Sequence, residues 1–294
     1  MKQEYEHIVN ELDVYKGIYY KNKKYKNINR VMVFDLDETL GCFLEFDILW
    51  YTIQQIAGSS PPISHTQLLD LYPEFLRPNI IDILKYVNKK KKSGECQKLY
   101  IYTNNQSQSY SVNMIADYLS NKVEKNNYAL FDQIIYAFKI NNQIVQIGRS
   151  THKKTHDDLI NCTLLPKKTA ICFIDDIEFD EMKKERIYYI QPKAYFHKMN
   201  SYDILNRLFS SKYKFALQKY ESLIRDQFLT RSMKINIFKR NIRDHSKYIK
   251  EQEIVSKKMM YHIREFFFST RKRNKTQKQN KTTNKFTRKS YIKN

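Results

Sequence analysis

Two aspartates, Asp35 and Asp37, directly follow an apolar run at residues 31–34 and are separated by one residue. Residues i and i+2 of an extended chain point to the same side, so both carboxylates can face one ligand. Two acids placed in this way can divide the work of group transfer, because one can attack or hold a metal while the other moves a proton. The pair therefore predicts nucleophilic chemistry, with Asp35 as the nucleophile and Asp37 as the general acid.

A calcium loop and a plain acidic turn are the alternatives for this pair. An EF-hand loop beginning at Asp35 needs glycine at its sixth position and glutamate at its twelfth, where this chain has Leu40 and Phe46. The calcium loop is therefore excluded. An isolated DxD can still be only an acidic turn after a strand. Whether this pair is functional therefore has to be judged from the other motifs of the chain.

Three short apolar runs predict the strands that position these groups. Residues 31–34, 98–102 and 170–174 are rich in aliphatic and aromatic side chains, lack a helical period and each end in polar residues. Such runs are typical of strands buried on both faces of a parallel sheet. Ligands of open α/β sheets bind at the carboxyl ends of the strands. The sequence therefore predicts an α/β fold with its site at that edge.

The segments at this edge occur in the order DLDETL, YIYTNN, KKTHDDLI and FIDD, so that Asp35, Thr103, Lys154 and Asp175 lie 68, 51 and 21 residues apart. The first segment resembles the first motif of the haloacid dehalogenase (HAD) superfamily, an apolar strand followed by DxDx(T/V), and the others resemble its later motifs in order. The segments FLRPNIIDIL and FIDD are most similar to the NIF-like branch, related to RNA polymerase II CTD phosphatases, and especially to versions encoded by giant DNA viruses. The resemblance covers about residues 28–200.

The resemblance implies a Rossmann-like three-layer sandwich with a central parallel sheet and small cap inserts, which we expect within residues 41–72 and 141–154. It also implies a Mg²⁺-dependent phosphohydrolase that forms a phosphoaspartate. The chain departs from cellular members in having TNN where they tend to have a Thr-Ala pair, and DD where they often have DN. A phosphorylated serine or threonine protein is the expected substrate.

The resemblance also implies roles for the other motif residues. Thr103, beside Asn104, would hold phosphoryl oxygens together with backbone N–H groups. A lysine is needed where several negative charges gather, and we expect Lys154 in this role, with Lys153 as the alternative.

The implied metal site uses the carboxylates of Asp35 and Asp175 and the backbone carbonyl of Asp37. Magnesium prefers hard oxygen ligands of this kind. Asp176 would hold a water molecule or the lysine.

Helices are predicted from apolar spacing on both sides of the catalytic segment. They are expected near residues 8–19, 80–92, 202–223 and 246–268, the last with Val255, Met259, Ile263 and Phe266 in one stripe.

Charge is unevenly distributed along the 294 residues, which carry a net charge of +21. Residues 211–294 hold 24 lysines and arginines against six acids, a net of +18, which leaves +3 for residues 1–210. The expected division is a lead-in helix at 1–27, a catalytic domain at 28–210, a helical extension at 211–270 and a disordered basic tail at 271–294.

The spacing of the cysteines bears on the cellular compartment. The chain has four cysteines that are scattered without CxxC spacing, namely Cys42, Cys96, Cys162 and Cys172. This pattern indicates a reducing compartment. No apolar stretch has the length of a signal sequence core or a membrane span. We therefore expect an intracellular protein, in the cytoplasm, the nucleus or a virion.

Two further functions stay open at this point. The basic tail could recruit the enzyme to nucleic acid, which suits a nucleotide or nucleic-acid-end phosphatase. A hypothesis of another class is a nucleic-acid-associated or structural protein that keeps a HAD fold, although such a binder would not need five intact motif residues. A solubilising tail without a fixed partner is the plainest interpretation of residues 271–294.

Overall fold

A computed structural model describes residues 12–21, 29–58, 60–106, 109–125, 129–233 and 245–268. Its centre is a six-stranded sheet in the order β1-β8-β7-β2-β3-β4. All neighbouring pairs are parallel except the edge strand β1, which is antiparallel to β8. The predicted α/β fold with a mostly parallel sheet is therefore confirmed. The strands are β1 (Leu12–Lys16), β2 (Arg30–Phe34), β3 (Lys98–Tyr102), β4 (Gln133–Ile135), β7 (Ala170–Ile174) and β8 (Ile187–Pro192).

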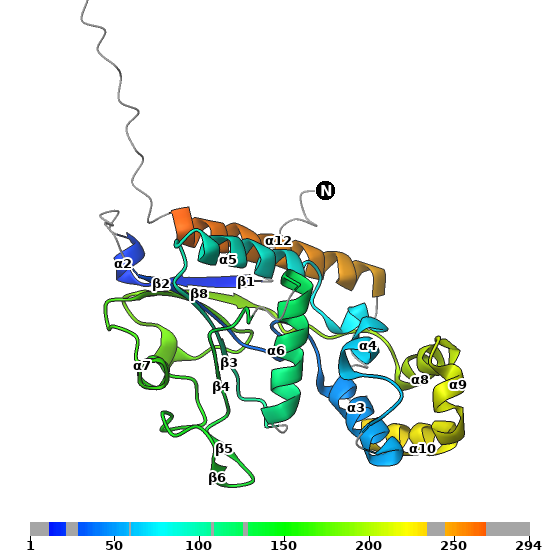
Figure 1. Cartoon of the computed structure of the whole chain (residues 1–294). Helices are drawn as coiled ribbons and strands as arrows, with labels where there is room; N and C mark the ends of the chain where they lie inside the picture. Colours follow the sequence, from blue (N-terminus) through cyan, green and yellow to red (C-terminus); the bar gives the residue numbers. More distant parts are fainter. Residues whose placement is uncertain are drawn as a thin grey trace, which may run out of the picture.

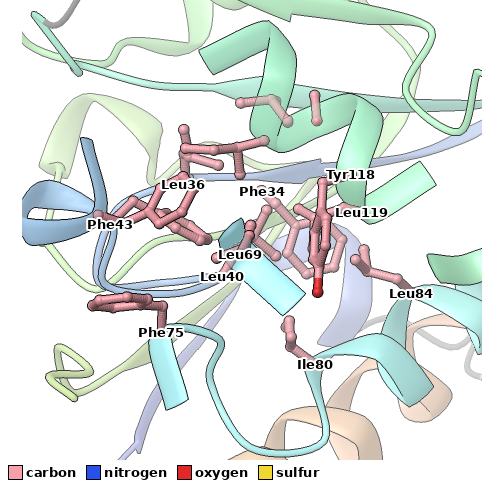
Figure 2. Packing of buried hydrophobic residues seen from close by; sticks show 14 of the residues in the cluster. Phe34, Leu36, Leu40, Phe43, Leu69, Phe75, Ile80, Leu84, Tyr118 and Leu119 are labelled. Atoms are coloured by element: carbon pink, nitrogen blue, oxygen red, sulfur yellow. The ribbon is translucent and has the colours of Figure 1, made fainter. Parts of the chain in front are cut away.

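The central strands are buried on both faces, as their apolar runs predict. In β2, Met32 and Phe34 join the larger of two core clusters, and Val31 and Val33 join the smaller one on the opposite face. This alternation follows from the two-residue period of a strand. Figure 2 shows Phe34 within the larger cluster, where it packs with side chains of the covering helices.

Most helices cover the face of the larger cluster, whereas the other face is covered by α7 (His156–Thr163) and the short helix η3 (Asp180–Met182). The two layers enclose the sheet (Figure 1). The helices that contribute to the larger cluster include α3 (Leu44–Ala57), α4 (His65–Asp70), α5 (Ile80–Lys92), α6 (Ser109–Val123), α8 (Ser201–Ser210), α9 (Lys214–Leu217), α10 (Glu221–Ser232) and α12 (His245–Phe268).

The expected helix at the start of the chain is wrong for residues 12–16, which form β1. Leu12 and Val14 pack against the larger cluster and Tyr15 against the smaller one, so the side chains alternate across the sheet. Pairing with β8 supplies the backbone partners that this short segment needs. A short helix, α2 (Ile18–Lys21), follows, and residues 1–11 lie outside the described part.

The insert positions and the later helices also differ in detail from expectation. Residues 41–72 hold α3 and α4. The two-stranded hairpin of β5 (Lys139–Ile140) and β6 (Gln143–Ile144) begins before the second expected insert and ends within it. The single helix expected at residues 202–223 is broken. It ends with α8 at Ser210, and α9, a 3-10 turn (Gln218–Tyr220) and α10 follow.

The helical extension packs as part of the same body. The predicted stripe of α12 is confirmed, since Val255, Met259, Ile263 and Phe266 are all buried in the larger cluster. Helix α12 lies beside α5, where the rings of Tyr86 and Phe267 are 6.2 Å apart (Figure 1). The predicted tail at 271–294 lies outside the described residues.

The described helices include none that is both long enough and apolar enough to cross a membrane. All four cysteines are free thiols, and three of them are buried.

Candidate active site

Asp35 and Asp175 meet at the carboxyl edge of the sheet because β2 and β7 are parallel neighbours. The amide of Asp35 donates to the carbonyl of Ile174, 2.8 Å away, which fixes the two strand ends side by side. From here the chain passes from β2 towards β3 on one side and from β7 to β8 on the other. This is a topological switch point, where ligands of open α/β sheets bind.

Lys154 lies between these two carboxylates. Its Nζ donates to Asp35 Oδ1 and to Asp175 Oδ2, the latter at 2.6 Å, and its side chain is almost fully buried. Burial alone would lower the pKa of Lys154, but the charges of Asp175 and Asp35 outweigh it and raise the pKa to about 12. Lys153, the alternative, is exposed and its Nζ lies 3.3 Å from Glu181 Oε1. The structure thus places Lys154, and not Lys153, in the site.

Three carboxylates, those of Asp35, Asp175 and Asp176, have oxygens within 4.8 Å of one another. Burial raises the pKa of Asp175 well above its usual range against the opposing charge of Lys154, and burial with the charge of Asp35 raises the pKa of Asp176 to about 6. Thr39 Oγ1 donates to Asp176 Oδ1 at 3.0 Å and accepts from the Asp176 amide. Hard oxygens grouped in this way fit a divalent cation such as Mg²⁺.

The Asp37 side chain lies outside that group of three. Its Oδ2 accepts a hydrogen bond from Asn105 Nδ2 at 2.7 Å. Burial, followed by the charges of Asp35 and Glu38, raises the pKa of Asp37 well above its usual range. The backbone turns sharply after Asp37, since Glu38 has a positive φ of 57°. Asp37 can therefore hold a proton beside Asp35.

Thr103 and Asn104 lie where β3 ends, as predicted. The Thr103 hydroxyl accepts from the amide of Asn105 at 2.9 Å, which leaves its own proton available to a ligand. Arg149 holds this turn, because its guanidinium donates to the carbonyl of Thr103 at 3.1 Å and to Asn104 Oδ1 at 2.8 Å. Asn104 is therefore engaged with Arg149. The sequence alone did not indicate Arg149, which follows the β5–β6 hairpin.

Arg77 is a second residue that the sequence alone did not indicate. It is fully buried beneath the loop that carries Asp37, and its Nε donates to the carbonyl of Thr39 at 2.7 Å. Its other nitrogens donate to the carbonyls of Glu38 and Lys193 and, at 2.8 Å, to Gln252 Oε1 of α12. Burial lowers the pKa of Arg77 to about 10, so it stays charged. Arg77 ties the loop to the last helix.

A pocket of about 580 Å³ opens above these groups. Its lining includes Asp35, Asp37, Thr103, Lys154, Asp175 and Asp176. Side chains from α3 and α6, with Arg231 of α10, complete its walls. The pocket combines a candidate nucleophile, a proton donor and a buried cation, which suits transfer of an anionic group.

No family model matches the chain, and neither a curated protein nor a solved structure does. The geometry described above is therefore the basis on which a function is proposed.

Proposed function

We propose that the chain is a Mg²⁺-dependent phosphohydrolase of the HAD type, which acts on phosphorylated serine or threonine proteins through a phosphoaspartate on Asp35. The observation that carries the proposal is the buried Lys154 between Asp35 and Asp175 at the base of an open pocket. Burying three charges is costly. Titratable groups with perturbed pKa values that face a cleft are typical of functional sites.

The first step of the proposed reaction transfers the phosphoryl group to the enzyme. A carboxylate oxygen of Asp35 attacks phosphorus, the bond from phosphorus to the substrate oxygen breaks, and Asp37 gives its proton to that oxygen. Lys154 stabilises the phosphoryl oxygens and the Asp35 carboxylate, because its charge is fixed next to both. We expect the Thr103 hydroxyl, whose oxygen accepts from the Asn105 amide, to donate to one phosphoryl oxygen.

The second step releases phosphate. Asp37, now ionised, takes a proton from a water molecule whose oxygen attacks phosphorus. The bond from phosphorus to Asp35 breaks, which restores the Asp35 carboxylate and the protonated Asp37. One residue thus serves as acid and then as base, and the position of Asp37 two residues from Asp35 supports this assignment.

Asp35, Asp175 and Asp176 are the side chains that would hold Mg²⁺, with the carbonyl of Asp37 as a further ligand. The bound ion would neutralise negative charge on the phosphoryl group.

A phosphatase panel tests the proposal. Purified full-length protein is given a small aryl phosphate, phosphopeptides, nucleotides and end-phosphorylated oligonucleotides, with Mg²⁺ or with a chelator. We expect Mg²⁺-dependent release of phosphate that is abolished by Asp35→Asn, with phosphopeptides preferred to nucleotides. Hydrolysis that survives Asp35→Asn, or that a chelator does not affect, contradicts the proposal.

A further inference from the structure

Arg231 projects into the pocket wall from α10 and is held there by two contacts. Its Nη1 donates to Oγ1 of the buried Thr52 at 3.1 Å, and its guanidinium lies 5.0 Å from the ring centroid of Tyr51. Among the described residues, no carboxylate lies within ion-pair distance of Arg231. By contrast, Arg225 of the same helix pairs with Glu221 at 2.8 Å. Arg231 is therefore an oriented cation that lacks an acidic partner within the described chain.

Exposed apolar side chains border the same pocket. Large hydrophobic residues are mostly exposed singly, and a group of them around a pocket indicates a binding surface. The lining includes four that are about half exposed, from 47% to 58%, namely Leu44, Tyr51, Tyr110 and Ile177. This apolar rim fits a substrate that has an apolar group beside its phosphate.

Most acids of the pocket follow the strands at its base, whereas Arg231 lies on the wall formed by α3 and α10. One acid of that wall, Asp47 of α3, accepts a hydrogen bond from Ser111 Oγ. The acids that come from the loops after β2 and β7 and line the pocket are Asp35, Asp37, Glu38, Asp175 and Asp176. They oppose the entry of a polyanionic nucleic-acid end. A substrate with one additional anion located at the wall would contact Arg231 and avoid the acids at the base.

We propose that Arg231 is a specificity-determining residue. It binds one acidic group, a carboxylate or a second phosphate, near the phosphorylated residue of a peptide substrate, while the rim of Leu44, Tyr51, Tyr110 and Ile177 packs on a neighbouring apolar side chain. A guanidinium matches both anions through paired N–H donors. The inference rests on the proposed phosphohydrolase function and names the substrate class of that site.

Matched phosphopeptides test this inference on the full-length protein. One set has an aspartate at successive positions around the phosphoserine, a second set has a second phosphoserine there, and a neutral set has asparagine; an end-phosphorylated oligonucleotide is the fourth substrate. We expect kcat/KM to be about tenfold higher for the best acidic peptide than for its neutral counterpart. The comparison of aspartate and phosphoserine distinguishes the two sources of the anion.

Variants assign the preference to Arg231. Arg231→Gln should remove the preference, chiefly through a higher KM for the acidic peptide, and Arg231→Lys should restore part of it. Arg225→Gln, on the same helix but paired with Glu221, should keep the preference. Thermal unfolding checks that all variants are folded.

Two results overturn the inference while leaving the phosphohydrolase intact. One is an equal preference in wild type and in folded Arg231→Gln, and the other is an oligonucleotide preferred to every peptide. Failure of the underlying function looks different. The wild type then hydrolyses no substrate, the aryl phosphate included, or Asp35→Asn remains active, and the inference falls with it.

Discussion

At the residue scale, Lys154 is the buried cation on which the carboxylates at the base of the pocket depend. It contacts Asp35 and Asp175 directly, and Asp176 lies within the same group of oxygens. Without Lys154 these like charges would face one another in a region of low dielectric, which is costly. In the proposed reaction Lys154 lies next to Asp35, the residue that would accept the phosphoryl group.

Lys154→Met is expected to reduce kcat by about 10²- to 10³-fold, the usual cost of removing one preorganised electrostatic group. It should also lower the free energy of unfolding by about 3 kcal/mol, because two buried carboxylates lose their partner. The matched control is Lys153→Met, since Lys153 is exposed and pairs with Glu181 alone. Steady-state kinetics and urea unfolding measure both effects. Equal kinetics for the two variants would show that Lys154 has no special role.

Strand ends made part of the site predictable from sequence. Asp35, Thr103 and Asp175 each follow an apolar run, and parallel strands bring such positions to one edge. Arg77 and Arg149 could not be found in this way, because their partners are mainly backbone carbonyls, some of them far away in the chain. Every residue has a backbone carbonyl, so the sequence does not indicate which carbonyls an arginine will bind.

At the element scale, the sequence predicted the helices with long apolar stripes and missed the short strand. The stripe of α12 was found because a period of 3.6 residues repeats over about three turns, from Val255 to Phe266. The strand β1 has only five residues, and its apolar spacing fits a helix as well as a strand. Residues 12–16 form a strand because they pair with the edge of β8. This pairing depends on the tertiary structure and cannot be recognised in the sequence of the segment.

Arg77 connects α12 with the loop that carries Asp37. Its guanidinium group donates to the carbonyls of Glu38 and Thr39 and also to the side chain of Gln252 in α12. We therefore expect Arg77 to position Asp37.

Arg77→Lys should lower kcat for a small aryl phosphate by about tenfold, because a lysine cannot reproduce the planar fork. The free energy of unfolding should fall by about 2 kcal/mol, since buried acceptors are left unpaired. Arg207→Lys is the matched control, because Arg207 pairs with Glu74 at a half-exposed position. Kinetics and thermal unfolding of both variants are compared. If Arg77→Lys loses stability but keeps its full kcat, Arg77 supports the fold without positioning Asp37.

At the scale of the whole molecule, the C-terminal extension combines a packed part and a charged part. Helix α12 shares the core of the sheet, while residues 271–294 have ten basic residues and no acids. Of the net charge of +18 beyond residue 210, +10 belongs to residues 271–294, whereas the proposed catalytic positions all precede residue 176 in the sequence. The two parts should therefore separate in experiment.

Truncation at two positions tests this separation. A chain ending at residue 270 should hydrolyse a small aryl phosphate as fast as the full protein, yet lose most of its salt-sensitive retention on DNA or RNA, because phosphate contacts give affinity that falls steeply with salt. A chain ending at residue 244 should fail to fold stably. The four buried side chains of the α12 stripe contribute about 1.5–3 kcal/mol each, which together approach the whole stability of a domain, about 5–15 kcal/mol.

Activity, circular dichroism and retention at increasing salt are measured for both truncated chains. Loss of hydrolysis on removing residues 271–294 alone would place the tail in the catalytic machinery. If retention on DNA or RNA is unchanged by the truncation, residues 271–294 are only a solvated appendage.

The intermediate of the proposed reaction is a covalent phosphoryl group on Asp35, and it can be tested by trapping it. The Asp37→Asn variant should transfer the phosphoryl group slowly and hydrolyse the acyl phosphate more slowly still, because it lacks the base that activates water. Rapid quenching after addition of a reactive aryl phosphate, followed by peptide mass spectrometry, locates the label. We expect a stoichiometric phosphoryl group on the peptide that contains Asp35 in the Asp37→Asn variant, and no such label in Asp35→Asn. A label on another residue, or turnover by the wild type without any covalent label, would contradict this expectation.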